Sequence, residues 1–112
     1  MPLKSKRSEF PFLVLSTAPS RKEAEQLSQK LLNSKLAACV NVFFPLISFF
    51  TWKGKKEKVQ EALLLIKTTS SLFPRVSKLI QKNHSYEVPE IIGWKIDKGN
   101  LSYLNWLKQS VH

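Results

Sequence analysis

The sequence predicts an α+β domain of the ferredoxin-like βαββαβ type, a sandwich of one antiparallel sheet and the helices of two β–α–β units. Two observations support this class. Apolar runs suited to buried strands alternate with segments whose apolar residues recur at helical spacing, in the order strand, helix, strand, strand, helix, strand. An amphipathic segment after the last strand predicts an extra C-terminal helix. At 112 residues the chain is long enough to bury one such core.

The first strand and helix are predicted from residues 10–34. Residues 10–17 (FPFLVLST) form a short apolar run, which we interpret as a strand. Ser20 and Glu23 have the spacing of a capping box, in which each residue satisfies a backbone donor of the other at a helix start. The helix is expected over 20–34, and its inner face carries Ala24, Leu27, Leu31 and Leu32.

The second and third strands are predicted to be unusually long. Residues 38–52 contain no charge, and fully extended they would span roughly 50 Å. We expect this strand to bend at Pro45, which sheets tolerate only at edges or bulges. A turn at 53–55 leads into a partner strand that ends near Thr68. The hairpin would project from the domain, and oligomerisation would cover its apolar surface, which includes Phe43, Phe44, Phe49, Phe50 and Trp52.

The second helix and the last strand follow this hairpin. Ser70 or Ser71 is expected to cap the helix, with Pro74 in its first turn. The last strand is expected over 90–96, and the terminal helix from about Asn100. The inward residues are predicted to be Leu72, Val76, Leu79 and Ile80 in the second helix, and Leu101, Leu104 and Leu107 in the last.

The chain is strongly basic, with eighteen basic and eight acidic residues and a net charge of +10. Such a balance favours anionic partners. We expect residues 1–9 to form a flexible basic tail and residues 10–112 a single domain. The lysines around the 53–55 turn are interpreted as a solvated basic hairpin, and a nucleic-acid-binding module that uses 53–58 is the alternative.

Membrane insertion and secretion are not expected. The apolar run at 10–15 is shorter than the core of a secretory signal. The uncharged stretch at 36–52 falls short of a transmembrane helix and is interrupted by Asn41 and Pro45. The single cysteine fits a reducing compartment. We therefore predict a soluble, cytoplasmic protein.

His84 is the first candidate for chemistry, in the segment KNHSYEVPEII at 82–92. A lone histidine followed by Ser-Tyr-Glu has no recognised metal-ligand spacing. A nucleophilic pair of Cys39 and His84 is conceivable but lacks an evident third group. We interpret the two as a core cysteine and a helix-ending histidine. A cysteine-dependent enzyme, which requires an exposed and reactive Cys39, is the alternative.

Several segments resemble, in the same order, the divalent-cation tolerance proteins called CutA: KLAACVNV at 35–42, SFFTWKGKKE at 48–57, EALLLIKTT at 61–69, SYEVPEIIGWKI at 85–96 and YLNWL at 103–107. The resemblance covers about residues 10–109. It implies a non-enzymatic ferredoxin-like subunit of a homotrimer, similar in architecture to PII signalling proteins. It also implies a role in the response to copper or another divalent metal.

The resemblance implies two kinds of site. A copper site would use Cys39 and His84. At positions where some members have a further cysteine and histidine, this chain has Ser16 and Asn83, which removes ligands that select copper. Ser85 replaces a usual proline. A ligand cleft or trimer interface, suited to a metal ion or a small anionic ligand, would use Trp52, Lys67, Tyr86, Glu87 and Glu90.

Overall fold

A computed structural model describes residues 9–112 of the chain, so the predicted basic tail lies outside the described residues except for Glu9. The described part confirms the α+β class and the predicted order of elements. The strands are β1 (Pro11–Ala18), β2 (Cys39–Trp52), β3 (Lys55–Thr69) and β4 (Ile91–Lys95). The helices are α2 (Arg21–Asn33), α3 (Phe73–Asn83) and α4 (Leu101–Gln109), and a short 3-10 helix, η1 (Ser70–Leu72), precedes α3.

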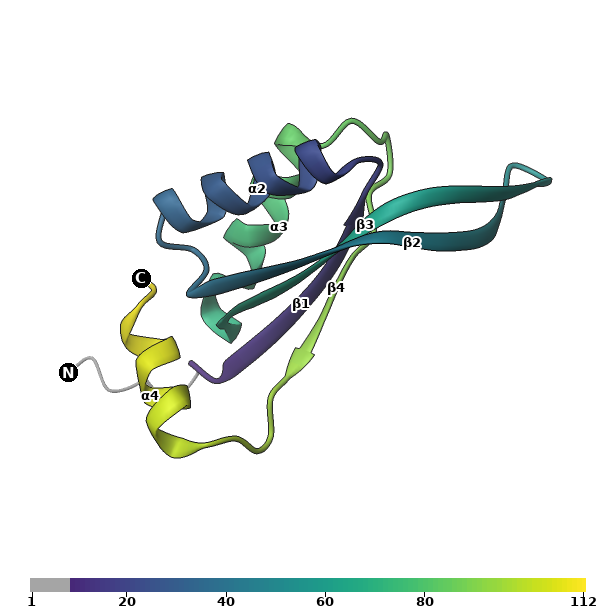
Figure 1. Cartoon of the computed structure of the whole chain (residues 1–112). Coiled ribbons are helices and arrows are strands. Elements are labelled where there is room, and N and C mark those ends of the chain that lie inside the picture. The colour runs from purple at the N-terminus through teal and green to yellow at the C-terminus, as the bar shows by residue number, and fades with distance from the viewer. Residues whose placement is uncertain (1–8) are drawn as a thin grey trace.

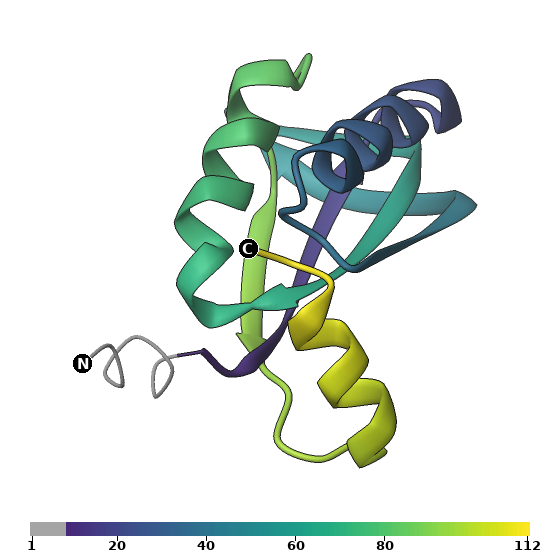
Figure 2. The same ribbon diagram turned by 90° about the vertical axis from the view of Figure 1, so that its left-hand side faces the viewer.

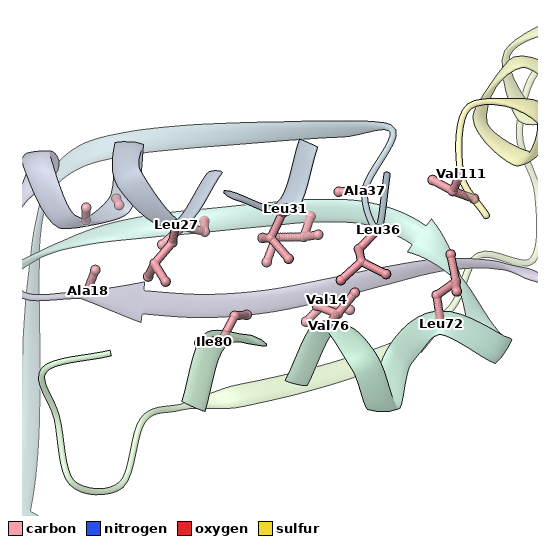
Figure 3. Close-up of a cluster of buried hydrophobic side chains, with 14 residues drawn as sticks. Val14, Ala18, Leu27, Leu31, Leu36, Ala37, Leu72, Val76, Ile80 and Val111 are labelled. Atoms are coloured by element: carbon pink, nitrogen blue, oxygen red, sulfur yellow. The ribbon is translucent and has the colours of Figure 1, made fainter. Parts of the chain in front are cut away.

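The four strands form one antiparallel sheet in the order β2-β3-β1-β4. Helices α2 and α3 lie side by side over one face of this sheet, and α4 packs at the end where β1 begins (Figures 1 and 2). The core lies between the sheet and the two helices. Figure 3 shows side chains of β1, α2 and α3 pointing into this space, among them Val14, Leu31 and Val76, which are fully buried.

Local sequence signals determine where α2 and α4 begin. The Ser20 hydroxyl accepts a hydrogen bond from the backbone N–H of Glu23 at 3.1 Å, as predicted. The Glu23 carboxylate, however, accepts from the backbone N–H and the hydroxyl of Ser85, at 2.9 and 3.1 Å. The reciprocal half of the capping box is therefore replaced by a bond to a distant loop. Asn100 caps α4 through its side-chain oxygen, which accepts from the N–H groups of Ser102 and Tyr103.

The predicted serine cap of α3 is wrong. The N-cap residue is Leu72, without a side-chain hydrogen bond, and Pro74 lies in the first turn as expected. The serine hydroxyls are used elsewhere. Ser70 Oγ accepts from the N–H of Phe10 at 2.9 Å, and Ser71 Oγ donates to the Glu9 carboxylate at 3.4 Å. Both serines thus connect the end of β3 to the start of β1.

Two leucines assigned to inner helix faces are exposed. The buried stripe of α2 runs through residues 24, 27, 28 and 31, so that Leu32 lies one position beyond it and is 43% exposed. In α4 only Leu107 is buried, Leu104 is half-buried, and Leu101 in the first turn is 72% exposed. The inward assignment of Leu32 and Leu101 was therefore wrong.

The long hairpin of β2 and β3 projects from the sheet, as predicted. β1 pairs with β3 only over residues 62–69, so residues 46–61 of the hairpin extend beyond any third strand. The molecule measures 52 × 26 × 23 Å, and Figure 1 shows the hairpin along its long axis. Lys53 and Gly54 form the turn, both with positive φ, of 51° and 78°, which suits a two-residue hairpin loop.

The expected bend at Pro45 is confirmed as a bulge in β2. Phe43 pairs with Leu63, but Leu46 pairs with Glu61, so Phe44 and Pro45 together oppose a single residue of β3. Since side chains alternate between the two faces of a strand, this extra residue changes which set of β2 residues faces each side.

The sheet face opposite α2 and α3 is called the open face here. Register and alternation place Leu15, Leu65 and Phe43 on it, together with Ile92 and Trp94 of β4. All five are half-buried or exposed, and Ile92 is 49% exposed. The open face is therefore apolar and only partly covered within the described part of the chain.

Candidate functional site

A pocket of about 610 Å³ lies where the projecting hairpin leaves the sheet, and we call it the acidic pocket. Four of the five residues predicted for a cleft or interface, Trp52, Tyr86, Glu87 and Glu90, line it, whereas Lys67 does not. The remaining lining residues are Thr17, Ser48, Phe49, Phe50, Val59, Glu61 and Val88. Among the described residues, the lining therefore contains three carboxylates and no basic side chain.

Glu61 is the buried centre of this pocket, with only 4% of its surface exposed. Its Oε1 accepts from the Ser48 hydroxyl at 2.6 Å, and its Oε2 accepts from the Tyr86 hydroxyl at 2.7 Å. A buried carboxylate requires such donors, because desolvation strongly disfavours an unpaired charge. The sequence prediction missed Glu61. The available signal was a lone carboxylate placed, at period two, on the same face as the apolar residues Leu63 and Leu65.

The Tyr86 phenol is held in its protonated form. Burial raises its pKa well above the usual value, and the hydrogen bond and charge of Glu61 and then the charge of Glu23 add to this shift. Loss of its proton would place two negative groups in contact. Tyr86 is consequently a hydrogen-bond donor to Glu61 and not a base or nucleophile near neutral pH.

His84 is enclosed at the end of α3, and its predicted role in ending a helix is confirmed because it is the C-cap residue. Its Nε2 lies 2.7 Å from the Thr17 carbonyl oxygen, and Nδ1 lies 3.0 Å from the Tyr86 backbone nitrogen. A carbonyl only accepts and an amide N–H only donates, which assigns the proton to Nε2 and the lone pair to Nδ1. Both ring nitrogens thus fix backbone around the pocket.

Cys39 lies half-buried at the start of β2, in a separate cluster. Its sulfur is 3.9 Å from the Lys67 Nζ and 4.0 Å from the Asn41 Oδ1, and Lys67 also donates to that oxygen. The pKa of Tyr103 is raised by burial and, in addition, by its proximity to Cys39. Lys67 therefore belongs with Cys39 and not with the other predicted cleft residues.

The structure does not bring Cys39 and His84 together. Cys39 pairs across the sheet with Lys67, which pairs with Leu13, whereas His84 contacts Thr17. The two β1 positions are four residues apart, roughly 13 Å along the strand. Among residues 9–112 no three His, Cys, Asp or Glu side chains lie close enough to hold a metal ion. The donor set of a single chain therefore does not fit a copper centre.

Ser16 and Asn83 stand at the positions where some CutA proteins were expected to have copper ligands. In this chain both side chains make hydrogen bonds to the backbone. The buried Ser16 hydroxyl donates to the backbone carbonyl of Glu90 at 2.7 Å. The Asn83 side-chain amide donates to the carbonyl of Leu79 at 2.8 Å, in the last turn of α3. Ser16 thus stabilises the backbone of Glu90, which lines the acidic pocket, and Asn83 stabilises the end of α3.

Comparison with known proteins agrees with this architecture. Residues 12–110 match the family model described as "CutA1 divalent ion tolerance protein". The chain belongs to this CutA1 family. The resemblance noted in the sequence is thereby confirmed.

Members of the CutA1 family from distant organisms share the sequence and the fold. The divalent-cation tolerance protein CutA of Thermus thermophilus is 41% identical over 98 residues, which are 88% of this chain and 95% of that protein. Human protein CutA is 40% identical over 93 residues, which are 83% of this chain and 52% of that protein. The crystal structure of CutA1 from Oryza sativa superposes with a TM-score of 0.89 at 39% identity, covering 94% of this chain and 97% of that one.

Two facts limit how far the CutA1 relatives describe this chain. It spans about half the length of several curated relatives, the human and plant proteins among them. The names of the relatives also differ in compartment, because two plant proteins are named chloroplastic and the Archaeoglobus fulgidus protein periplasmic. Within residues 9–112 of this chain, no helix has the length and apolar character needed to cross a membrane.

Proposed function

We propose that this CutA1-family chain is a non-enzymatic, cytoplasmic divalent-cation tolerance protein that works as a homotrimer of single-domain, ferredoxin-like subunits. The strand order β2-β3-β1-β4, with two helical crossovers on one face, supports the ferredoxin-like description. The lone cysteine supports a reducing compartment. The observation that carries the proposal is the uncovered apolar surface of the open face and the hairpin.

The homotrimer accounts for this apolar surface. Phe49 is 71% exposed on the hairpin, and Trp52 and Phe50 are also exposed beside the acidic pocket. Monomeric proteins rarely expose contiguous apolar patches larger than a few hundred Å². A neighbouring subunit that packs its hairpin along the open face would bury both surfaces at once. The acidic pocket would then lie at the boundary between subunits.

The charge of the acidic pocket favours a cation as its ligand. Glu61, Glu87 and Glu90 line it, and no basic side chain from residues 9–112 does, so a small anion would be repelled by this lining. Carboxylate oxygens suit hard divalent ions better than copper. Since the described part of a single chain holds no complete metal site, we propose that a cation binds weakly and that a neighbouring subunit supplies further ligands.

The hydrogen bonding of the pocket supports a non-enzymatic role. Glu61 and Tyr86 are bound to each other, and His84 uses both ring nitrogens on the backbone. Cys39 lies apart from His84, so the alternative of a Cys–His enzyme lacks its pair. Nothing in the geometry favours the PII-like signalling alternative or a nucleic-acid module on the hairpin.

Two measurements test the proposal. Multi-angle light scattering at micromolar concentration is expected to give three times the chain mass, and a monomer would overturn the trimer. Calorimetric titration with Mn²⁺ and Cu²⁺ is expected to weaken in Glu87→Gln/Glu90→Gln. It should be unchanged in Glu25→Gln/Asp97→Asn, which removes the same charge outside the pocket. Equal loss in both would reject the pocket as the site.

The metal roles first predicted for Cys39 and His84 are tested in the same titrations. Cys39→Ser and His84→Ala are compared with the unsubstituted chain at equal protein concentration. Loss of Cu²⁺ affinity in Cys39→Ser would support Cys39 as a ligand contributed from its own cluster. Unchanged binding in both variants would remove both residues as ligands and leave the carboxylates.

A further inference from the structure

A second concave surface lies on the helix layer, between α2 and α3, with a volume of about 650 Å³. We call it the basic groove. Four of its lining residues are cationic, Lys30 from α2 and Arg75, Lys78 and Lys82 from α3, and Leu36 and Leu79 are its aliphatic lining residues. Helices α2 and α3 lie on the same side of the sheet (Figure 2), and the residues that line the basic groove come from these helices and from the segment after α2.

The positive charge of the basic groove is not balanced within the described residues. None of the described residues that line the groove carries a carboxylate. In residues 9–112 an ion pair joins Arg21 to Glu25, and the Glu23 carboxylate lies 3.4 Å from Nδ1 of His84; neither contact involves a groove residue. All four cations are exposed, so their potential extends into the concavity, where low-dielectric walls concentrate it.

Helix stability explains only half of these charges. Lys30 and Lys82 lie in the last turns of α2 and α3, where a cation interacts favourably with the helix dipole. Arg75 lies in the first turn of α3, where a cation opposes the dipole, and that turn has no acidic residue. Lys78 also lies three residues after Arg75, and Lys82 lies four residues after Lys78. Like charges at these spacings destabilise a helix. An anionic ligand would offset both costs.

We propose that the basic groove binds a small ligand that carries two or more phosphate groups. The planar guanidinium of Arg75 matches a phosphate through paired hydrogen bonds, and the lysines neutralise neighbouring charges. Single-stranded nucleic acid is disfavoured because the groove is lined by no aromatic side chain on which bases could stack. A membrane surface is disfavoured because the site is concave and its aliphatic residues, Leu36 and Leu79, are buried or half-buried.

The proposal can be tested with two variants that remove equal charge. Arg75→Gln/Lys78→Gln/Lys82→Gln alters the basic groove, and Lys55→Gln/Lys56→Gln/Lys58→Gln alters the hairpin. Each is titrated with inorganic tripolyphosphate by calorimetry at constant ionic strength, after circular dichroism has verified folding. The unsubstituted chain and the hairpin variant should bind alike. The groove variant should bind at least about tenfold more weakly, because it loses charge-assisted hydrogen bonds.

Several outcomes would overturn the proposal. These are no binding of tripolyphosphate by the unsubstituted chain, equal loss in both variants, and groove-dependent binding of single-stranded RNA without binding of tripolyphosphate. Binding to vesicles that contain a bisphosphorylated inositol lipid, competed by tripolyphosphate and lost in the groove variant, would support the site and identify a lipid headgroup as one source of the phosphates. The result does not depend on the trimer, since a monomer that binds tripolyphosphate would leave this proposal intact.

Discussion

Single side chains around Glu61 control the acidic pocket. The carboxylate is buried and receives both of its hydrogen bonds from neutral hydroxyls, those of Ser48 and Tyr86. Removing one donor would leave a buried negative charge partly unsatisfied, which costs more than an ordinary hydrogen bond. The position of Tyr86 is in turn fixed by His84, whose Nδ1 accepts the Tyr86 backbone N–H.

The raised pKa of Tyr86 predicts a pH dependence that Tyr86→Phe removes. Below the ordinary phenol pKa of 10.0 the folded and unfolded chains both keep the proton, so the stability difference between wild type and variant is constant. Above it the unfolded chain releases its proton first, and the wild type therefore loses stability relative to the variant. Urea unfolding from pH 8 to 11 measures this. A difference that stays constant throughout would contradict the assigned shift.

Gly93 of β4 is predicted not to tolerate a side chain. A Cβ there would lie 2.6 Å from Cε2 of Phe12 and 3.1 Å from the backbone oxygen of Leu13. Phe12 is itself held against Phe73, with ring centroids 5.6 Å apart. Gly93→Ala should lower the unfolding free energy by about 1–3 kcal/mol, as overpacking usually does. Gly99→Ala is the control, since its Cβ would meet only the flexible side chain of Leu104, and equal losses would argue against the clash.

At the scale of elements, α2 is connected to the loop after α3 through one residue. Glu23 donates its backbone N–H to the Ser20 hydroxyl, and its carboxylate accepts from the backbone N–H and the hydroxyl of Ser85. The start of one helix therefore holds the loop that carries Tyr86. Local spacing in the sequence predicted the cap, because both partners lie within one helical turn.

Ser20→Ala is predicted to lower the unfolding free energy by about 1 kcal/mol, the usual effect of losing an N-cap hydrogen bond. The reason is that the N–H of Glu23 would lose its acceptor at 3.1 Å. Ser20→Thr, which keeps a hydroxyl, should lose much less. Thermal unfolding of the three chains at one concentration provides the measurement, and equal midpoints would show that the cap does not stabilise α2.

Features that depend on distant partners were beyond the sequence. The strands, the projecting hairpin and the bend at Pro45 were predicted because alternation, length and proline chemistry are local. The serines before α3 were misassigned because their partners, Phe10 and Glu9, are about sixty residues away in the chain. The alternation that places Glu61 among apolar residues is local, but its hydrogen-bond partner Tyr86 lies 25 residues away in the chain, and its role was missed. Lys67 was predicted to lie in the same cleft as Tyr86. In the sheet it pairs with Cys39, six residues along β3 from Glu61 of the acidic pocket.

At the scale of the whole molecule, the helix layer and the open face differ in charge and polarity. The helix layer carries the unpaired cations of the basic groove, whereas the open face is apolar and the acidic pocket lies at its hairpin end. An assembly that buries the open face would leave the basic groove in contact with solvent. The proposed cation and phosphate sites would therefore act on different surfaces.

Ile92→Lys is predicted to convert the proposed trimer into monomers while leaving the subunit folded. Ile92 lies on the open face with 49% of its surface exposed, so the monomer tolerates the change, but a buried interface would not accept the charge. Leu32→Lys is the matched control, because Leu32 is 43% exposed on the helix layer. Sedimentation velocity should show monomers for the first variant and trimers for the second. Monomers in both, or trimers in both, would refute an interface on the open face.

The bulge at Pro45 also acts as a phase shift within a single strand. Before it, odd-numbered residues of β2 such as Phe43 face the open side. After it, even-numbered residues do, and this places Ser48, Phe50 and Trp52 on the side of Glu61. Deleting Pro45 would remove the extra residue and let Phe44 alone oppose residue 62, so Leu46 would still pair with Glu61 and the wall of the acidic pocket would be unchanged. A change of one residue in length at Pro45 is therefore absorbed by the bulge, whereas the same change beyond Leu46 would turn the following side chains of the strand to the opposite face.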